Sequence, residues 1–493
     1  MECLDRLYLN GYIGRLATGP ELSMFMRNQL AVHVDSLKPQ TPYRLGPVDF
    51  VLPELDRINK CAYWDYQRDR IYIRSNPRLR RVARRNQRKK RRRVLPVNVT
   101  VSPSRPWKCP ACASNRITMS GRHSKLLYDL RFTTGGVKRW VSKYIIDHYK
   151  CRSCGMPFPS DTYEWTRHRY GLQLLAYVIH NIIELHIPQL KLSGSLLSLF
   201  AYQIGQPTIN GLKRRAAELY QDTYEEIKHT LLHGKLIHAD ETHLSTKSSS
   251  GYVWVFTSME EVVYLWSATR EGSVPVEFLS GFTGVLVSDF YSAYDSISCA
   301  QQKCLVHLIR DLNEDVLKES FNEEMKALVH EFTALLKPVV ETIDRFGLKA
   351  HFLKKHRAEV ARFYERLLPR NYKTELARKA QDRFRRNQGK LFTFLDHDNV
   401  PWNNNNAEHA IKAFAALRNV IEAYSTESGI RDYLVLLSIY QTCEYRGVDF
   451  LQFLRSGEKR VDDYVRKRHS QRSRPRLQET SRIRAHFWSD PTR

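Results

Sequence analysis

The spacing of apolar residues changes several times along this chain, and each change marks a different kind of secondary structure. Between residues 171 and 232 apolar side chains recur at every third or fourth position, as they do on one face of an amphipathic helix. From 235 to 312 short apolar runs end at turn-forming residues, which is typical of β-strands. Helical spacing returns from 312 to 394 and again from 406 to 454. The pattern predicts an α/β domain with helices before it and inside it.

Five strands are expected in the strand-rich region. The first and the fourth are separated by a stretch long enough for a helical crossover, so we expect them to be parallel neighbours. The second is apolar on both faces and should lie inside a covered sheet. It should form a hairpin with the third through a tight turn near Met259 and Glu260. In chain order the five candidates are 235–240, 252–256, 262–266, 284–288 and 302–308.

Three helices are expected upstream of these strands, over 172–183, 195–203 and 208–220. The third follows a Gly-Gln-Pro turn at 205–207 and carries three consecutive basic residues, Lys213, Arg214 and Arg215. A helix, a short turn and a basic helix form the outline of a helix-turn-helix DNA reader, whose second helix enters the major groove. An ordinary helical hairpin has the same outline, so both alternatives remain open.

The composition narrows the class of protein. With 42% hydrophobic residues among 493, the chain can build a sizeable core, which excludes a wholly disordered protein. Lys and Arg number 78 against 52 Asp and Glu, and this net charge of +26 favours a nucleic-acid partner. A membrane partner is disfavoured because the most apolar stretch, 172–187, contains five polar or charged residues. The N-terminal residues lack a signal-peptide profile, so we expect a soluble cytoplasmic protein, associated with the nucleoid of a prokaryotic host.

The densest positive charge lies at residues 78–93, where eleven of sixteen residues are Lys or Arg and none is acidic. Such a block should stay extended unless it lies against phosphates. We interpret it as a DNA-contacting part of a basic linker over 78–106, and the alternative is a purely solubilising linker. A second basic region, the tail 455–493, is expected to be loose, and residues 1–77 have no assigned role. The predicted DNA contacts in the linker are Arg88, Lys89, Lys90, Arg91, Arg92 and Arg93.

Four of the nine cysteines form two C-x-x-C pairs, which predict a zinc site. Each pair can present two thiolates from one tight loop, and four thiolates leave no open position on the metal, as in a structural zinc ribbon. The 38 residues between the pairs (113–150) are more than is usual, and their strand-like sequence suggests a hairpin. Coincidence and a redox pair are the alternatives. The zinc-ribbon-like segment is expected over 107–158, with one Zn²⁺ held by Cys109, Cys112, Cys151 and Cys154.

Two aspartates stand where the predicted parallel strands end. Asp240 closes the first strand and Asp289 closes the fourth, so both side chains should emerge at the same edge of the sheet. Glu408 lies at the start of a later helix. Three carboxylates at one point need cations to stay ionised, and two Mg²⁺ or Mn²⁺ ions about 4 Å apart would form a site that cuts phosphodiester bonds. Taken singly, each acid is more often a turn or capping residue.

Several segments occur in an order that resembles one protein family. The runs IHADET, GYVWVF, GVLVSDFYSAYD, CLVH and NNNNAEHAIK, followed by Arg418 and Asn419, resemble bacterial insertion-sequence DDE transposases, most of all the insertion-sequence-66 family. The resemblance covers residues 165–455. Two positions depart from the family pattern: Asn403 replaces an aspartate, and His409 replaces an arginine after the glutamate.

The resemblance implies both a fold and an active site. The fold would be an RNase H-like mixed five-stranded sheet in a catalytic domain over 233–454, with a helical insertion at 313–395 and a helical DNA-binding region at 165–232. The three carboxylates would form a catalytic triad that binds two divalent ions. Cys304 and His307 match a C-x-x-H element of such transposases. Because no further metal ligand is obvious near them in the sequence, we interpret them as support for the active site.

The combined prediction is a DNA transposase that cleaves strands at the ends of its element and joins them to target DNA. Its partners would be the terminal inverted repeats, the target DNA, further copies of the chain in a synaptic complex, and accessory proteins of the element. One alternative is a DNA-binding protein without chemistry, descended from a transposase, and the intact carboxylates argue against it. The other is a metal-dependent nuclease that never joins strands, which only a joining assay distinguishes.

Overall fold

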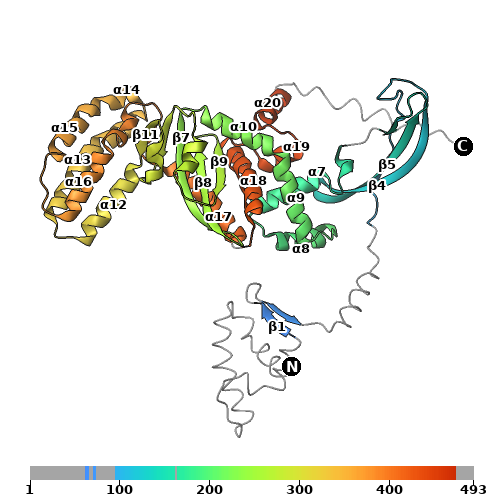
Figure 1. Ribbon diagram of the computed structural model, residues 1–493, viewed down its shortest axis with the longest axis horizontal. Helices are drawn as coiled ribbons and strands as arrows, with labels where there is room; N and C mark the ends of the chain where they lie inside the picture. The colour runs from blue at the N-terminus through green and yellow to red at the C-terminus, as the bar shows by residue number, and fades with distance from the viewer. Residues whose placement is uncertain (1–61, 66–69, 74–94, 161–163, 423, 473–493) are drawn as a thin grey trace, which may run out of the picture. The chain divides into compact units, whose positions relative to one another are not determined.

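The chain divides into two compact units, residues 1–96 and 97–493. The computed structural model describes residues 62–65, 70–73, 95–160, 164–422 and 424–472 (Figure 1). The predicted DNA contacts at 88–93 and the tail beyond residue 472 lie outside these residues. In the first unit, β1 (Ala62–Asp65) and β2 (Arg70–Ile73) form a two-stranded antiparallel ribbon.

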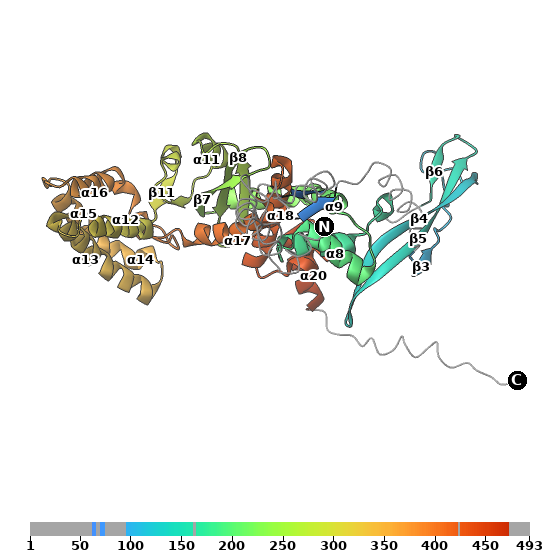
Figure 2. The ribbon, with the colours of Figure 1, turned by 90° about the horizontal axis from the view of Figure 1, so that it is seen from below.

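A long β-hairpin begins the second unit (Figures 1 and 2). Its strands are β4 (Ile117–Thr133) and β5 (Gly136–Cys151), which pair antiparallel along their whole length, with one bulge near Met119. The short strands β3 (Val99–Val101) and β6 (Pro157–Pro159) both add to β5. The predicted hairpin is therefore present in the spacer between the cysteine pairs. Because Ile117 lies opposite Cys151, the hairpin returns the chain to its starting point and brings the two pairs together.

Four helices follow the hairpin: α7 (Leu172–Ile183), α8 (Gln189–Phe200), α9 (Gln206–Leu219) and α10 (Gln221–Leu232). The first was predicted at these bounds. The second begins six residues earlier than the predicted 195–203 and ends at Phe200, because Ala201 adopts a left-handed conformation with φ of 57°. The turn between α8 and α9 is residues 201–205.

The hairpin is joined to α7 by one buried carboxylate. Asp129 of β4 accepts the backbone N–H of Leu174 at 2.7 Å and so caps the first turn of α7. Gly171, directly before the helix, leaves room for this carboxylate, because a Cβ at that position would lie 2.1 Å from an Asp129 oxygen. The contact explains why a glycine precedes the helix.

A mixed five-stranded sheet follows, in the spatial order β11-β10-β7-β8-β9. The strands β7 (Leu236–Ser245), β8 (Ser250–Thr257) and β9 (Val262–Ser267) form an antiparallel meander. On the other side of β7, β10 (Val285–Ser288) pairs with it in parallel, and β11 (Ala300–Lys303) pairs in parallel with β10. The predicted parallel pairing of the first and fourth strands is confirmed. The crossover between β9 and β10 contains α11 (Ser273–Phe278).

Only the first two residues of the predicted fifth strand, 302–308, lie in a strand, and the prediction was wrong from Cys304 onward. The strand ends at Lys303, and residues from Leu305 onward form α12 (Leu305–Lys318). Apolar residues at helical spacing explain the difference, because Leu305, Leu308 and Leu312 are all buried on one face of α12. The run that was read as a strand therefore contains only the end of one, followed by the first turn of a helix.

Two long helices cover the sheet, α17 (Asn405–Ile421) against β7 and β8, and α18 (Glu427–Tyr445) against β9 (Figure 1). Side chains of α18 bond to the outer edge of β9: Thr442 accepts the N–H of Val262 at 3.1 Å, and Ser438 accepts that of Tyr264 at 2.9 Å. These bonds satisfy donors that an edge strand would otherwise leave open. The chain continues into α19 (Phe450–Ser456) and α20 (Val461–Arg472). The expectation of a loose tail from residue 455 was therefore wrong as far as Arg472, because α20 buries Val461 and pairs through Asp462 with Arg446.

Residues 313–395 form a helical subdomain between β11 and α17. Its main helices are α13 (Glu323–Phe346), α14 (Ala350–Leu353), α15 (Arg357–Leu367) and α16 (Glu375–Arg386), and the range contains no strand. Three buried rings, Phe332 of α13, Phe363 of α15 and Phe384 of α16, pack with centroids 5.0 to 6.0 Å apart. The subdomain therefore has its own aromatic core.

The chain leaves the sheet for this subdomain and returns at one place. The N–H of Leu305 donates to the carbonyl of Trp402 at 2.8 Å, and the N–H of Asn404 donates to the sulfur of Cys304 at 3.2 Å.

In the part of the chain that the structure describes, no helix is long and apolar enough to cross a membrane.

Candidate active site and zinc centre

The sheet brings Asp240 and Asp289 to the same level on neighbouring strands. Val287 of β10 lies opposite His238 of β7 in the parallel register. Asp240 and Asp289 each follow this pair by two residues, Asp240 within β7 and Asp289 directly after the last residue of β10. Equal offsets from a paired position keep the same side of the pleat, and neighbouring strands are about 4.8 Å apart. The prediction that Asp240 closes its strand was wrong, because β7 continues to Ser245 through its pairing with β8. The two aspartates are nevertheless close enough for the charge of Asp289 to act on Asp240.

Asn404 fixes the start of α17 against β7. This side chain is fully buried, and its amide donates to the carbonyl of Ala239 at 2.9 Å. Its oxygen lies 3.1 Å from Nδ1 of His238, whose pKa is lowered to about 4 by burial, so the neutral ring donates this hydrogen bond. Glu408 follows one turn later in α17. The third carboxylate is therefore held by contacts to the residues directly before Asp240.

The charges of the three carboxylates act on one another. The pKa of Asp240 is raised to about 7, first by burial and then by the negative charges of Glu241, Asp289 and Glu408. One backbone N–H, that of Glu241, bonds to Asp240 at 2.8 Å and opposes the shift. A carboxyl group in such surroundings carries its full charge at neutral pH only if a cation offsets its neighbours.

Glu408 also faces the C-x-x-H element. Its Oε1 lies 3.8 Å from Nδ1 of His307, and both atoms are buried without a hydrogen-bond partner. One ligand atom from each of Cys304, His307 and Glu408 lies within 4.8 Å of the other two, so the three side chains could hold a metal ion. The sequence interpretation found no further ligand near Cys304 and His307 because Glu408 is about a hundred residues away along the chain.

A second buried carboxylate beside the cluster escaped the sequence interpretation. The Glu241 side chain is 2% exposed, pairs with Arg270, and accepts the hydroxyl of Tyr294 at 2.6 Å. The Arg270 guanidinium lies 4.0 Å from the ring centre of Tyr291, whose backbone N–H donates to Asp289 at 2.9 Å. These contacts link Glu241 to Asp289, and the backbone N–H of Glu241 bonds to Asp240. The sequence shows only that Glu241 is an acid next to Asp240, and this does not indicate that its side chain is buried.

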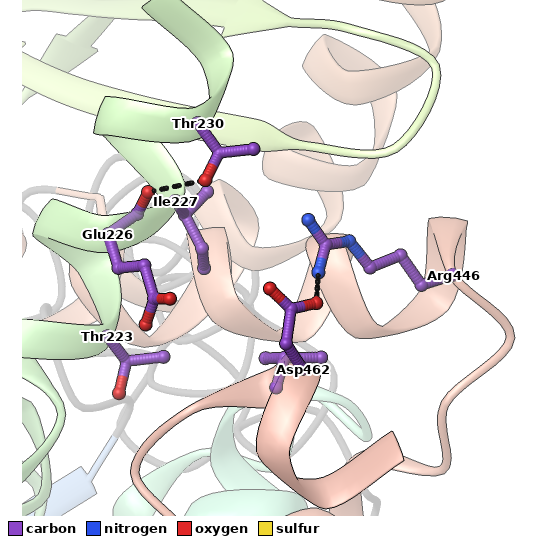
Figure 3. Close-up of a pocket in the computed structure, with 7 residues that line it drawn as sticks. Thr223, Glu226, Ile227, Thr230, Arg446 and Asp462 are labelled. Carbon is purple, nitrogen blue, oxygen red and sulfur yellow. Dashed lines mark hydrogen bonds and ion pairs between the residues drawn. The ribbon is translucent and has the colours of Figure 1, made fainter. Parts of the chain in front are cut away.

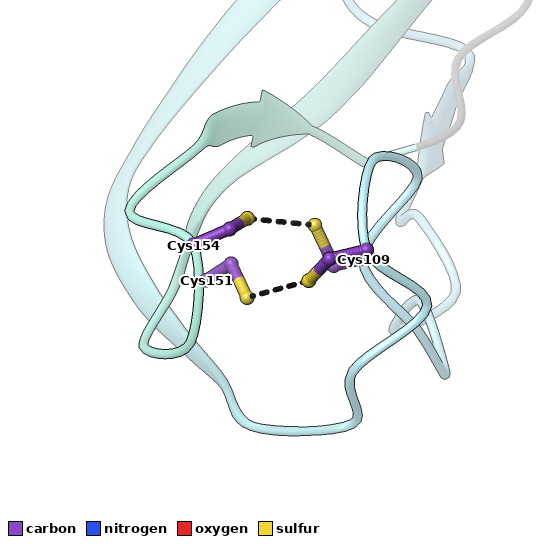
Figure 4. Close-up of side chains that lie close together, drawn as sticks. Cys109, Cys151 and Cys154 are labelled. Atoms are coloured by element: carbon purple, nitrogen blue, oxygen red, sulfur yellow. Dashed lines mark hydrogen bonds between the residues drawn. The ribbon is translucent and has the colours of Figure 1, made fainter.

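The two cysteine pairs converge at the base of the hairpin (Figure 4). Sulfur atoms of Cys109 and Cys154 lie 3.6 Å apart, as do those of Cys112 and Cys151, and all four lie within 4.8 Å of one another. Four thiolates around Zn²⁺ at about 2.3 Å would be separated by about 3.8 Å. Backbone N–H groups lower the pKa of Cys151 to about 6, which favours the thiolate that a metal needs. The cluster is compatible with zinc.

The structure contradicts the predicted DNA contact of Lys213. Its side chain is fully buried under α18, donates to the carbonyl of Gly429 at 2.6 Å and lies 3.5 Å from Asp432. Burial lowers its pKa to about 8. The neighbouring Arg215 packs over the ring of Trp165 at 4.2 Å, so Arg214 is the exposed member of the basic triplet. The helical pattern placed three cations together, but only Arg214 is exposed, and it lies 3.7 Å from Glu218 on the same helix.

One shallow pocket lies between α10, α18 and α20 (Figure 3). Arg446, directly after α18, and Asp462 of α20 form an ion pair of 2.8 Å across it. Arg446 also pairs with Glu261, at the start of β9. The pocket contains none of the cluster carboxylates, and its contacts serve to fasten α20 to the body of the protein.

The sequence was compared with known proteins and with models of protein families, and one family model assigns the chain to a family. The chain is similar to the uncharacterized protein y4hP of Sinorhizobium fredii, with 22% identity over 427 residues that cover 74% of this chain and 72% of that protein. It is also similar to the uncharacterized protein y4qI of the same species, with 25% identity over 254 residues, 45% of this chain and 47% of that protein. The sequence model described as Transposase IS66 family matches residues 167–432, which include Asp240, Asp289 and Glu408. Because this match spans more than half of the chain, the protein belongs to the IS66 family of transposases.

Proposed function

We propose that this transposase cleaves DNA strands at the ends of its element and joins them to target DNA, using divalent ions held by Asp240, Asp289 and Glu408. The observation that carries the proposal is the parallel pairing of β7 and β10, because Asp240 and Asp289 each follow the pair His238 and Val287 by two residues. The effect of the Glu408 charge on the pKa of Asp240 supports its membership of the same cluster.

The fold proposed for this domain is RNase H-like. An antiparallel meander of three strands, extended beyond its first strand by two parallel strands, supports this assignment. In sheets with parallel strands, ligands bind beyond the carboxyl ends of the strands where the order changes direction. Here that change occurs between β7 and β10, next to both aspartates.

The residues of the cluster fit divalent ions. Oxygen ligands suit Mg²⁺ and Mn²⁺, and the mutual repulsion that raises the pKa of Asp240 is the charge that such ions would offset. The buried Oε1 of Glu408, which has no hydrogen-bond partner, is an acceptor available to a cation. When bound, the ions supply Lewis-acid activation of water or of a 3′-hydroxyl group and neutralise charge on the leaving oxygen.

The remaining residues of the site position these carboxylates. His238 and Asn404 hold the start of α17 against β7, and Arg270 binds the Glu241 carboxylate. Cys304 and His307 are proposed to support the active site through their contact with Glu408. Each of these groups orients a ligand and contributes none of the reacting atoms.

DNA recognition is proposed for α8 and α9 as a helix-turn-helix. Polar residues on the outer side of α9 support this role, because the start of a recognition helix is the part that meets base edges. The exposed residues there are Gln206, Thr208, Asn210 and Arg214. The basic residues Arg88 to Arg93 are proposed to add contacts to phosphates, and one Zn²⁺ on the four cysteines would stabilise the hairpin. Pairing of copies in a synaptic complex and accessory proteins belong to the same proposal.

The test replaces each carboxylate by its amide: Asp240→Asn, Asp289→Asn and Glu408→Gln. We expect cleavage of an end-containing duplex, and joining to a second duplex, to fall by orders of magnitude, because a two-metal site fails when any ligand is lost. End binding should persist. Asp222→Asn and Glu277→Gln, both exposed acids on other helices, are the matched controls.

Three outcomes would contradict parts of this proposal. Cleavage by Glu408→Gln at the rate of the unmutated protein would contradict the proposed cluster. Cleavage without joining, in the presence of both end and target DNA, would favour a nuclease. An unmutated protein that binds ends but never cuts them with Mg²⁺ or Mn²⁺ would support the non-catalytic alternative.

A further inference from the structure

The helical subdomain divides its charge unequally between its two halves. Residues 313–346, which contain α13, carry four Lys or Arg and eight Asp or Glu. Residues 347–390, which contain α14 to α16, carry fourteen Lys or Arg and four Asp or Glu. Aromatic rings from both halves pack in one core. The second half is therefore folded, and its positive charges lie on the surface of a folded subdomain.

Six of the fourteen cations are engaged in ion pairs. Arg370 pairs with Glu331 of α13 at 2.8 Å, and Arg383 pairs with Asp311 of α12 at 2.6 Å, so these two fasten the helices together. The other paired cations are Arg357, Lys379, Arg385 and Lys390. Eight cations remain, all exposed and, within this fully described range, without an ion pair: Lys349, Lys354, Lys355, Arg362, Arg366, Lys373, Arg378 and Arg386. Such cations are free to meet a polyanion.

The last turn of α16 and the residues that follow it lie beside the carboxylate cluster. The Arg383 guanidinium lies 4.0 Å from the ring centre of Phe290, the residue directly after Asp289. Lys390 pairs at 2.8 Å with Asp295, in the segment that follows β10. From Arg386 to Arg378 the helix α16 spans about 12 Å, equivalent to about three to four base pairs of duplex DNA.

We propose that the exposed cations of α15 and α16 bind the sugar–phosphate backbone of duplex DNA next to the bond that the carboxylate cluster cuts. The inference rests on the proposed function, to which it adds a surface and a ligand. Phosphate contacts by Lys and Arg position a duplex without reading its sequence, so this surface takes DNA of any sequence. That property suits DNA outside the element ends, whose sequence the helix-turn-helix would not recognise.

The experiment measures binding of the full chain to a 30-base-pair duplex that lacks element ends, between 50 and 200 mM salt. The test variant carries four changes to Gln, at Arg362, Arg366, Arg378 and Arg386. The matched control removes the same charge from the acidic half, with Gln at Lys318, Lys326, Lys337 and Arg345. The slope of log affinity against log salt is negative, and each lost phosphate contact makes it less steep by about 0.9. The slope of the test variant should therefore be less steep by about 3 to 4 units. The control should keep the slope of the unmutated protein.

A further variant with Lys at Arg362, Arg366, Arg378 and Arg386 keeps the charge and should retain the original slope. Equal slopes of log affinity against log salt for the test and control variants would overturn the inference. A Lys variant whose slope is as shallow as that of the Gln variant would also overturn it. The proposed function fails separately: an unmutated protein that never cuts DNA would contradict it even if the slopes differ as expected. Carboxylate-dependent cutting combined with equal slopes would contradict the inference alone.

Discussion

The carboxylate of Asp129 offers a direct test of the junction between the hairpin and α7. It caps α7 through the N–H of Leu174 and also accepts the N–H of Leu130 at 2.9 Å. Burial nevertheless raises its pKa from 3.8 to about 6, since these N–H groups offset only part of the desolvation. Ionisation of Asp129 therefore costs more in the folded protein than in the unfolded chain.

The sign and the size of the effect follow from this shift. The folded protein binds the proton more tightly, so the free energy of unfolding falls as pH rises from about 4 to about 6, and the loss is complete above that. A shift of about two units at about 1.4 kcal/mol per unit gives a loss of about 3 kcal/mol. Asp129→Asn remains neutral and keeps an oxygen that can accept both N–H groups. The free energy of unfolding of this variant, measured relative to that of the unmutated protein, should therefore increase by about 3 kcal/mol between pH 4 and pH 8.

Amide hydrogen exchange of α7, corrected for the intrinsic effect of pH, measures this free energy of opening. Asp222→Asn changes an exposed aspartate on α10 and should show no such dependence. A difference between Asp129→Asn and the unmutated protein that is constant from pH 4 to pH 8 would refute the reasoning. So would a gain that appears only at low pH.

Three further predictions concern the zinc centre, the basic linker and the start of α17. The purified protein should contain about one Zn²⁺ per chain, and Cys109→Ser or Cys151→Ser should release it, as metal analysis would show; full metal content in both variants would exclude the site. Replacing residues 88–93 by Ser should flatten the salt dependence of DNA binding by several units, whereas an unchanged slope would indicate a linker without contacts. Asn404→Ala should leave a buried carbonyl unpaired and cost about 1 to 3 kcal/mol in urea unfolding; an unchanged unfolding midpoint would contradict the anchoring role.

The sequence predicted those parts of the structure that depend on local pattern. Four of the five strands, the hairpin between the cysteine pairs and the helix that carries Glu408 follow from periodicity and from turn residues. The fifth strand was extended too far, because an apolar run of that length fits a strand end or a helix start equally well until packing partners are known.

The parts that were missed depend on contacts between distant segments. The burial of Lys213 follows from α18, which begins more than two hundred residues later and supplies Gly429 and Asp432. The approach of Glu408 to His307 requires both ends of the helical subdomain to meet at the sheet. No spacing within either segment contains that information.

The way the helical subdomain leaves and rejoins the sheet has a consequence for how the protein can change. Cys304 and Asn404 are bonded to each other although 100 positions separate them, and Leu305 and Trp402 are bonded beside them. Relative to the sheet, the intervening chain is therefore a loop whose two ends are adjacent. Doubling the length of such a loop costs only about 0.6 kcal/mol in closure entropy. Insertions and deletions far from this junction can thus accumulate without displacing Glu408. The subdomain can diverge, or exchange its charged surface for another, while the carboxylate cluster keeps its geometry.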